Sequence, residues 1–286
     1  MKYAFIRQQR EAHSVKVLCR TVGVSVSGYY DWVDRPSSAT RQANHRLLTR
    51  IRCFHKSSRS IYGSPCIHRD LIDSGECVSR QRIARLMRSA GIQSKMAKKF
   101  VITIDSKNTR PPAADRLQRL FRVSDKNKAW VSDTTFIRTR QGWLYLAVML
   151  DLYSRQVIGW AMSERNDTKL VADALMMAIW RHGKLKDVIV HSDQGSTYAS
   201  GDYQTLLSDN GLICSMSRKG ECHDNAVAES FFGTLKTELV DHEDYRTKEQ
   251  ARQSLIEYIE VFYNRQRRHS YLDYVSPVEY EHESAP

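Results

Sequence analysis

The placement of three acidic residues constrains the fold of this chain more than any other feature. Asp133 lies within a run rich in β-branched and other apolar residues, and Asp193 lies at the end of another such run. Runs of this kind are typical of strands. Glu229 lies in a helix-like run, and thirty-five residues separate it from Asp193. Taken singly, Asp193 could be a turn residue and Glu229 a solvated surface glutamate. The three carboxylates can act together only if the fold brings two strands and a helix to one place.

The chain from residue 128 onwards alternates strand-like and helix-like runs. We predict strands at 129–138, 143–153, 156–163, in the run that ends at Asp193, and at 212–216, with helices at 168–182 and around Glu229. Three antiparallel strands, a helix and a parallel strand are typical of an α/β domain. Because side chains alternate along a strand, Val131, Asp133, Thr135 and Ile137 should share one face of the first strand.

Several side chains near the acids are expected to support them. Asp224 is predicted to cap the helix of Glu229, and Asn225 lies one turn before Glu229 on its face. We expect His191 to have a structural role beside Asp193. Lys236 follows Glu229 by two turns, so it should share that face and point toward DNA phosphate, although a solvated lysine is the ordinary alternative.

Charge divides the chain into two unlike halves. The net charge is +12, from 44 Lys and Arg against 32 Asp and Glu. Residues 1–128 carry 27 basic and 9 acidic side chains, whereas residues 129–286 carry 17 and 23. This division of charge is expected for a basic DNA-binding module joined to a domain that carries a carboxylate site. The alternative is that the basic surface only aids solubility.

The basic half contains two helical patterns. Residues 1–40 have the outline of a helix-turn-helix, with Gly23 at the turn and Ser25 or Ser27 as the cap of the second helix, although a helical hairpin that never touches DNA is equally compatible. We predict that residues 41–104 form a second helical DNA-binding module and that residues 105–127 form a basic linker. Residues 128–240 are predicted to form a catalytic core, and residues 241–286 its C-terminal helical extension. In the second module, we predict an outward-facing row of arginines on a helix capped by Ser79, consisting of Arg80, Arg82, Arg85 and Arg88.

Four sequence motifs give the chain a resemblance to a known family. They are Trp-x-x-Asp-x-Thr at 130–135, His-Ser-Asp-x-Gly at 191–195, Asp-Asn-Ala-x-x-Glu-Ser-Phe at 224–231, and Tyr-Asn followed by Arg-Arg-His-Ser-Tyr-Leu within 263–272. Together with the acid spacing, they resemble the bacterial insertion-sequence transposases of the frameshifting copy-out type, specifically the product of their second reading frame, within the DDE retroviral-integrase-like superfamily.

This resemblance implies a ribonuclease-H-like, integrase-type α/β core, preceded by all-α helix-turn-helix-like domains. It also implies catalysis by Asp133, Asp193 and Glu229, which would hold two Mg²⁺ ions, for which Mn²⁺ can substitute. His191 and Asn225 are expected to support these ligands from behind. The implied reaction nicks the 3′ ends of the element and transfers the strand to target DNA. The residues that we expect to contact DNA are Lys236, Arg80, Arg82, Arg85, Arg88, Arg218, Lys219, Arg267 and Arg268.

The implied partners are double-stranded DNA, as terminal inverted repeats and as target, a homo-oligomeric assembly on that DNA, and the upstream-frame product or its frameshift fusion. No sustained heptad repeat is visible in this chain. Two other functions are compatible with parts of the sequence. One is a non-catalytic transposase remnant that binds DNA ends or acts as a repressor, and the other is a ribonuclease H or resolving nuclease.

Cysteine spacing and hydropathy exclude several other classes of protein. The six cysteines include no Cys-x-x-Cys pair, so we expect ordinary reduced thiols rather than a zinc site. The longest apolar run, at 143–150, is far shorter than the roughly 20 residues of a membrane helix. The first residues lack a signal-peptide pattern. We therefore expect a soluble, cytoplasmic protein associated with DNA.

Overall fold

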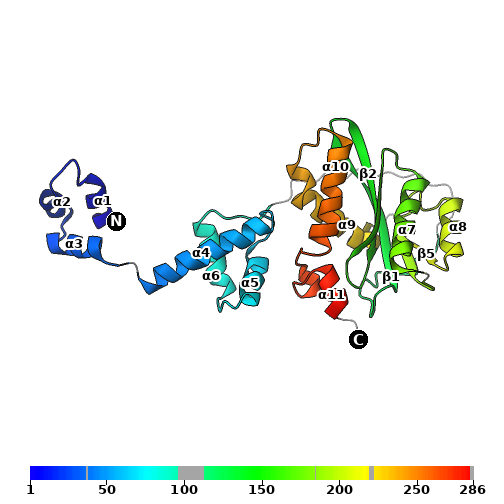
Figure 1. Cartoon of the computed structure of the whole chain (residues 1–286), viewed down its shortest axis with the longest axis horizontal. Coiled ribbons are helices and arrows are strands. Elements are labelled where there is room, and N and C mark those ends of the chain that lie inside the picture. Colours follow the sequence, from blue (N-terminus) through cyan, green and yellow to red (C-terminus); the bar gives the residue numbers. More distant parts are fainter. Residues whose placement is uncertain (37, 96–112, 184, 219–221, 284–286) are drawn as a thin grey trace.

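The computed structural model describes residues 1–36, 38–95, 113–183, 185–218 and 222–283. Three bodies follow one another along the molecule (Figure 1), of which the first two are helical and the third is α/β. The first contains α1 (Lys2–Gln9), α2 (Val15–Val22) and α3 (Val26–Asp34), and the second contains α4 (Ala39–Ser57), α5 (Ser64–Asp73) and α6 (Arg80–Ser89). The third is built on a five-stranded sheet. Along the described residues, no helix is both long and apolar enough to span a bilayer.

The sheet has the strand order β3-β2-β1-β4-β5. Its strands are β1 (Ala129–Thr139), β2 (Gly142–Asp151), β3 (Val157–Ser163), β4 (Ile189–Ser192) and β5 (Ile213–Met216). The first three are antiparallel neighbours, and β4 runs parallel to both β1 and β5. β1 is therefore central, and its carboxyl-terminal half extends beyond the short β4. This is the ribonuclease-H-like arrangement that the sequence predicts.

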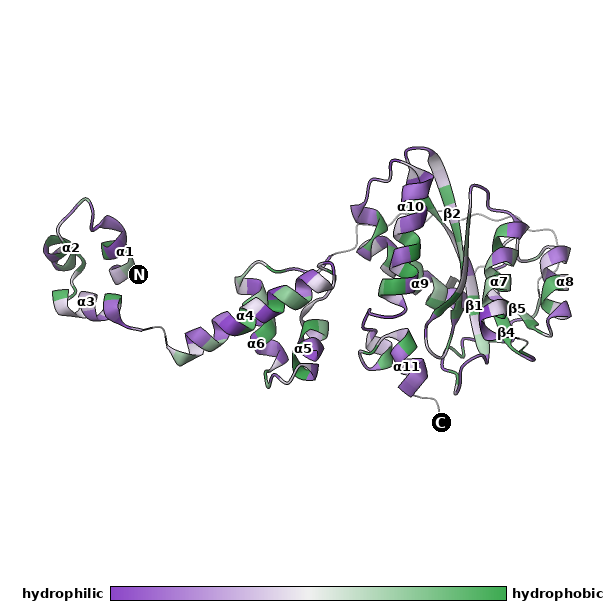
Figure 2. Ribbon diagram, viewed as in Figure 1, coloured by the Kyte–Doolittle hydropathy of each residue, from purple (hydrophilic) through white to green (hydrophobic). Residues whose placement is uncertain are grey.

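Helices cover both faces of the sheet. On one face lie α7 (Thr168–His182) and α8 (Gly201–Asp209), and on the other α9 (Ala226–Glu238) and α10 (Lys248–Ile256), which continues as a π-helix at Glu257–Tyr263. Short 3₁₀ turns at Cys222–Asn225, Val240–His242 and Ser270–Leu272 and a final helix, α11 (Pro277–Glu283), complete the core. Hydrophobic residues concentrate on the strands and on α7 (Figure 2).

Close packing of α7 on the sheet depends on Gly159 in β3. A Cβ atom at this position would lie 2.3 Å from the carbonyl oxygen of Ala174 and 2.9 Å from the backbone nitrogen of Ala178. Any side chain there would push the helix away, so the small residues of α7 and this glycine fit each other. Asp167 caps α7 by accepting a hydrogen bond from the backbone N–H of Leu170, and the helix has the predicted bounds.

Two predictions about the core need correction. The structure contains a helix, α8, that the sequence prediction does not include. Ser200 caps this helix by accepting a hydrogen bond from the N–H of Tyr203. The sequence also predicts an apolar stripe of Leu255, Ile256, Ile259 and Phe262 on the last helix, yet Ile256 is 39% exposed, whereas the other three side chains are buried. Ile256 is rotated by about 100° from Leu255 around the helix axis, so it lies off the buried face.

The first helical body matches the predicted helix-turn-helix outline. Gly23 ends α2 in the left-handed conformation, with φ of 67°, which glycine adopts without steric cost. The hydroxyl of Ser25 then accepts from the N–H of Gly28 and caps α3. Tyr29 is buried in a small core with Leu18 and Ile6. Ser25, rather than Ser27, is therefore the cap.

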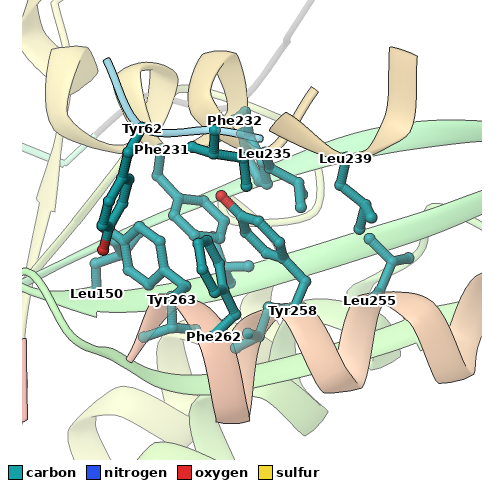
Figure 3. Close-up of a cluster of buried hydrophobic side chains, with 14 of the residues drawn as sticks. Tyr62, Leu150, Phe231, Phe232, Leu235, Leu239, Leu255, Tyr258, Phe262 and Tyr263 are labelled. Atoms are coloured by element: carbon teal, nitrogen blue, oxygen red, sulfur yellow. The ribbon is translucent and has the colours of Figure 1, made fainter. Parts of the chain in front are cut away.

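The second helical body packs against the sheet body through a shared hydrophobic cluster. Ile83, Leu86 and Met87 of α6 are buried, and Ser79 caps that helix as predicted. Tyr62 belongs to the same cluster as Phe262 and Tyr263 of the π-helix (Figure 3). Its hydroxyl donates to the carbonyl oxygen of Gln266 at 3.0 Å. The module and the core therefore share one continuous interior.

Ion pairs complete this interface. The guanidinium of Arg267 lies 2.7 Å from Oε1 of Glu238, and the hydroxyl of Tyr258 donates to Oε2 of the same carboxylate. Arg268 pairs with Asp70 at 2.6 Å and with Asp73 at 2.7 Å, both on α5. The two arginines that were predicted to hold DNA are therefore used to hold carboxylates of the chain itself.

The predicted extended linker also differs from the structure in its described part. Residues 113–127 form no helix or strand, but they pack on the core. The hydroxyl of Ser215 in β5 accepts from the N–H groups of Arg116 and Leu117, and the side chain of Leu117 is buried. This segment is therefore an arm docked on the core beside β5.

We predict that Arg267→Ala lowers the free energy of unfolding by about 3–5 kcal/mol, because it leaves the buried carboxylate of Glu238 without its charge partner. Denaturant titration followed by tryptophan fluorescence measures the change. Arg265→Ala is the matched control, since Arg265 is exposed at the same helix end, and it should shift stability by less than about 0.5 kcal/mol. Equal effects of the two variants would contradict the internal role of Arg267.

Candidate active site

The pairing of β1 with β4 brings two of the three predicted acids together. The parallel register places Val131 opposite His191. Continued by two residues, the same offset places Asp133 opposite Asp193, which follows the end of β4. Val131 and Ile137 lie in the core cluster that also contains Phe231 of α9. Asp133 therefore faces α9, as the alternation along β1 predicts.

Hydrogen bonds to the backbone hold Asp133 and its neighbours. The N–H of Thr134 donates to Oδ1 of Asp133 at 2.7 Å. Ser132, on the opposite face of β1, donates to the carbonyl oxygen of Val148 and shares a hydrogen bond with the hydroxyl of Tyr198. The amide of Asn225 donates to the carbonyl oxygen of Ser132 at 3.1 Å. Asn225 thereby ties the start of α9 to the strand residue next to Asp133.

Asp193 is held by the turn that follows β4. The N–H of Gly195 donates to Oδ1 of Asp193 at 2.9 Å, and the amide of Gln194 donates to the carbonyl oxygen of Ser217. A Cβ atom at Gly195 would lie 2.9 Å from that carboxylate oxygen. A side chain at position 195 would therefore displace this carboxylate oxygen.

Glu229 lies in the first turn of α9 and is exposed. The helix is anchored by Phe231 and Leu235, which are buried against the sheet, and by Asn225 at its start. The negative charge of Glu229 acts on Asp133, which shows that the helix carries this carboxylate into the vicinity of the strand pair.

The electrostatics of the two aspartates are those of buried like charges. Burial, followed by the charge of Asp193, raises the pKa of Asp133 to about 8, and Glu229 adds to this effect. The N–H of Thr134 and the ammonium of Lys236 act in the opposite direction. Burial also raises the pKa of Asp193, against the hydrogen bond from Gly195. The site therefore concentrates negative charge that its own cations do not balance.

The donor set consists of carboxylate oxygens, which are the ligands that Mg²⁺ and Mn²⁺ prefer. Within the described residues, however, no three His, Cys, Asp or Glu side chains already lie close enough to make a metal-binding group. Asp133 and Asp193 are neighbours, and Glu229 lies on the facing helix. The chemistry and charge of the site fit a divalent cation, and closing of Glu229 onto the aspartate pair would complete the ligand set.

His191 and Asp224 form a second polar cluster beside the site. His191 is fully buried, and its Nδ1 and Nε2 atoms lie 2.9 Å and 3.2 Å from the hydroxyls of Ser215 and Ser217. Burial lowers its pKa, so the neutral ring braces β4 against β5. This position agrees with the structural role predicted for it.

Asp224 does not cap α9 as predicted. Its buried carboxylate receives hydrogen bonds from the guanidinium and the backbone N–H of Arg218 and from the guanidinium of Arg119. These bonds hold its pKa far below the usual range. The N-cap position belongs to Asn225, whose side chain is directed to β1 instead. The role of Arg119 cannot be recognised from local sequence, because its partner lies 105 positions away.

The predicted DNA-contacting residues fall into three groups. Arg80, Arg85 and Arg88 are exposed on α6, whereas Arg82 is part-buried and donates to Oδ1 of Asn44. Lys236 and Arg218 lie near the acids, Lys236 half-buried and Arg218 paired with Asp224 but 56% exposed. Arg267 and Arg268 are internal, as described above. Lys219 lies outside the described residues.

Comparison with known proteins agrees with this architecture. Two family models, each described as an integrase core domain, match residues 124–222 and 229–284, and a model described as an HTH-like domain matches residues 42–100. Transposase InsF for insertion sequence IS3A of Escherichia coli (strain K12) is 38% identical over 286 residues, which cover 99% of both chains. The chain belongs to the insertion-sequence IS3 transposase family. The integrase core supports polynucleotidyl transferase activity in general.

One further relative has a similar sequence identity, whereas the solved structures that resemble the chain are less similar in sequence. A 31 kDa protein of insertion element IS600 from Shigella sonnei, described as uncharacterized, is 41% identical over 260 residues, which cover 91% of this chain and 96% of that protein. Among solved structures, a simian T-cell lymphotropic virus intasome is 16% identical with a TM-score of 0.48, covering 82% of this chain and 74% of that one. The HTLV-2 integrase catalytic core domain in complex with magnesium is 17% identical, with a TM-score of 0.44 and coverage of 56% and 100%.

We predict that Asp133→Asn stabilises the metal-free transposase at high pH. The raised pKa of Asp133 means that the folded protein favours the protonated acid, so stability is highest below the ordinary pKa of 3.8 and falls as pH rises through about 8. Because a difference of one in pKa corresponds to about 1.4 kcal/mol, the variant should gain roughly 1–4 kcal/mol at pH 9. Thermal unfolding from pH 5 to pH 9 in EDTA measures this.

The control for this prediction is Asp173→Asn, an exposed aspartate of α7 that pairs with Lys169. Its stability profile should run parallel to that of the wild type. Parallel profiles for Asp133→Asn and the wild type would show that Asp133 is not strained by burial and neighbouring charge.

Proposed function

We propose that this transposase cleaves the 3′ ends of its insertion sequence and joins the freed 3′-OH to target DNA by a metal-dependent DDE mechanism. The observation that carries the proposal is the half-buried pair Asp133 and Asp193, which the parallel register of β1 and β4 brings opposite each other and which Glu229 faces. Concentrated carboxylate charge of this kind costs stability, and such sites are characteristic of function rather than of packing.

Asp133 and Asp193 would share the metal ions, and Glu229 would complete the coordination. We propose two Mg²⁺ ions, with Mn²⁺ as a substitute. Two such ions, when bound, activate the attacking oxygen and stabilise the leaving oxygen of an in-line phosphodiester displacement. The protein contributes the geometry: the turn of Gly195 fixes Asp193, the N–H of Thr134 fixes Asp133, and Asn225 fixes the start of α9. Asn225 and His191 would act as supporting residues behind the ligands.

Basic side chains around the acids would hold the substrate. Lys236 lies on α9 with Glu229 and within electrostatic reach of Asp133, so its ammonium would bind a phosphate next to the cleaved bond. Arg218 and Lys219 would approach the DNA from the segment before α9. The exposed arginines of α6 would bind phosphates of the terminal inverted repeat farther along the duplex.

The partners that we propose are the terminal inverted repeats, the target DNA and further copies of the transposase on that DNA. The upstream-frame product, or its frameshift fusion, would supply part of the end recognition. A non-catalytic end-binding protein uses the same basic surfaces, so the experiment must separate binding from cleavage.

The first test compares wild type with Glu229→Gln on labelled duplexes that carry the element's own ends, with Mg²⁺. We expect nicking and joining by the wild type and a loss of at least about 100-fold in the variant, because removal of even a supporting residue behind a metal ligand costs 10–100-fold. Glu249→Gln, at an exposed residue in the first turn of α10, is the matched control and should retain activity. If this chain is inactive, the upstream-frame fusion is tested in the same way.

The outcomes of this test are distinct. Activity of both the wild type and Glu229→Gln would exclude the assigned role of Glu229. Binding of the ends without nicking, by this chain and by the fusion, would favour the end-binding protein over the enzyme.

A second test concerns the arginines of α6. We predict that Arg85→Ala reduces the slope of log affinity against log salt concentration by about one, because one phosphate contact releases roughly one counterion. Fluorescence anisotropy with a labelled terminal repeat between 50 and 300 mM salt measures the slope. Gln81→Ala, an exposed neutral residue on the same helix, should leave it unchanged. An unchanged slope for Arg85→Ala would place the DNA elsewhere.

A further inference from the structure

An exposed aromatic pair lies on β1 and β2, farther along the hairpin than Asp133, and has no role in the fold described so far. Phe136 of β1 and Trp143 of β2 are 44% and 48% exposed. Their rings meet edge to face, with centroids 5.0 Å apart. Exposed large aromatic side chains that gather on a soluble protein usually mark a binding surface.

The position of the pair follows from the sheet. The register pairs Phe136 with Tyr145 and Arg138 with Trp143, so these four side chains share one face of the β1–β2 hairpin. Nearer the middle of the sheet the same face is buried beneath α7, with Ala147 and Met149 in its core. Figure 1 shows the end of the hairpin reaching beyond α7. The aromatic pair therefore lies where the helix layer ends and the sheet is open.

Positive charge borders the aromatic surface. The Nζ atom of Lys236 lies 5.4 Å from the centroid of the Phe136 ring, within the range of a cation–π contact. Arg138 is exposed on the same face as the two rings. Lys236 is also within electrostatic reach of Asp133. The ammonium of Lys236 thus has both Asp133 and the Phe136 ring within reach, although the acid and the rings lie on opposite faces of β1.

We propose that Phe136 and Trp143 form a stacking platform for an unpaired base of the DNA strand that enters the active site. Lys236 and Arg138 would hold the phosphates on either side of that base. The inference rests on the proposed function, because the acids define where the strand is cut. Aromatic rings flanked by cations match an unpaired nucleotide, which presents a π-face next to a negative phosphate. A fully paired duplex hides its base faces and would gain nothing from the rings.

The physical role of the platform would be to capture a frayed end. An in-line attack requires the scissile phosphate to approach the carboxylates closely, and unstacking of the outermost base pairs gives the strand the freedom to do so. Stacking on Phe136 and Trp143 would offset part of the free energy that unpairing costs. The pair would thus favour DNA ends over internal duplex positions.

The test uses the full chain and two duplexes of the element's own terminal repeat, with the outermost base pairs either matched or mismatched. Each carries 2-aminopurine at an outermost position, and Ca²⁺ replaces Mg²⁺ during binding. We expect quenching of 2-aminopurine on the mismatched duplex by the wild type, and its loss in Trp143→Leu and Phe136→Leu. Affinity for the mismatched duplex should fall about 5- to 150-fold, the range for one aromatic–base stack, with little change for the matched duplex.

The controls use the remaining aromatic residues. Trp180→Leu removes the tryptophan of α7 that is 79% exposed and should behave as the wild type. Trp143→Phe keeps an aromatic ring and should restore quenching, which a merely structural effect of Trp143→Leu would not predict. Circular dichroism and thermal unfolding check that each variant is folded.

The outcomes separate this inference from the proposed function. Equal loss of affinity for both duplexes, or quenching that survives in Trp143→Leu, would overturn the stacking platform while leaving the test with Glu229→Gln unaffected. A change in the sedimentation of the DNA-free protein in Trp143→Leu, without a change in quenching, would assign the surface to contact between copies and overturn the inference. Quenching without metal-dependent nicking would retain the platform and reject the catalytic proposal.

Discussion

The parallel pairing of β1 with β4 is the interaction on which the rest of this structure depends. It joins two segments sixty positions apart, and its register alone places Asp133 beside Asp193. A slip of one residue would turn Asp133 to the opposite face, toward α7, where the core is apolar. The register is fixed by burial on both faces, since Trp130 packs on one side of β1 and Val131 on the other. The same apolar contacts that stabilise the sheet therefore set the geometry of the acids.

Burying two carboxylates side by side opposes folding, and the structure places the compensating interactions at a distance. The helix α9 carries Glu229 at one end and Glu238 at the other. Glu238 is held by Arg267 and Tyr258, and the carbonyl oxygen of the same residue accepts a hydrogen bond from Lys95 of the helical module. Tyr62 and Arg268 join that module to the same region. The position of the third acid thus depends on contacts with both the C-terminal segment and the module that precedes the core.

The features that were predicted correctly from the sequence are those that depend on local periodicity. Alternation along β1, the amphipathic face of α6 and the caps Ser25 and Ser79 are each encoded within a few residues. The incorrect predictions share a different cause. A solvated arginine and a buried, paired arginine have the same local pattern, and Arg268 meets Asp70 only because the fold brings together positions 198 residues apart. For the same reason, residues 113–127 resemble a free linker in sequence, although Ser215 fixes them on the core.

Charge explains why the basic groups nearest the acids are arranged as they are. A phosphodiester is negatively charged, and so is the group of acids. The two would therefore repel each other unless cations lie between them. Lys236 contacts the Phe136 ring and lies within electrostatic reach of Asp133. Burial lowers its pKa, and the charges of Asp241 and Asp133 oppose that shift. With Arg138 on the same face as the rings, a DNA strand bound as we propose would meet both cations and aromatic faces on its way to the carboxylates. Such a path would select a strand whose bases are unpaired, and this would link the shape of the hairpin to the recognition of an end.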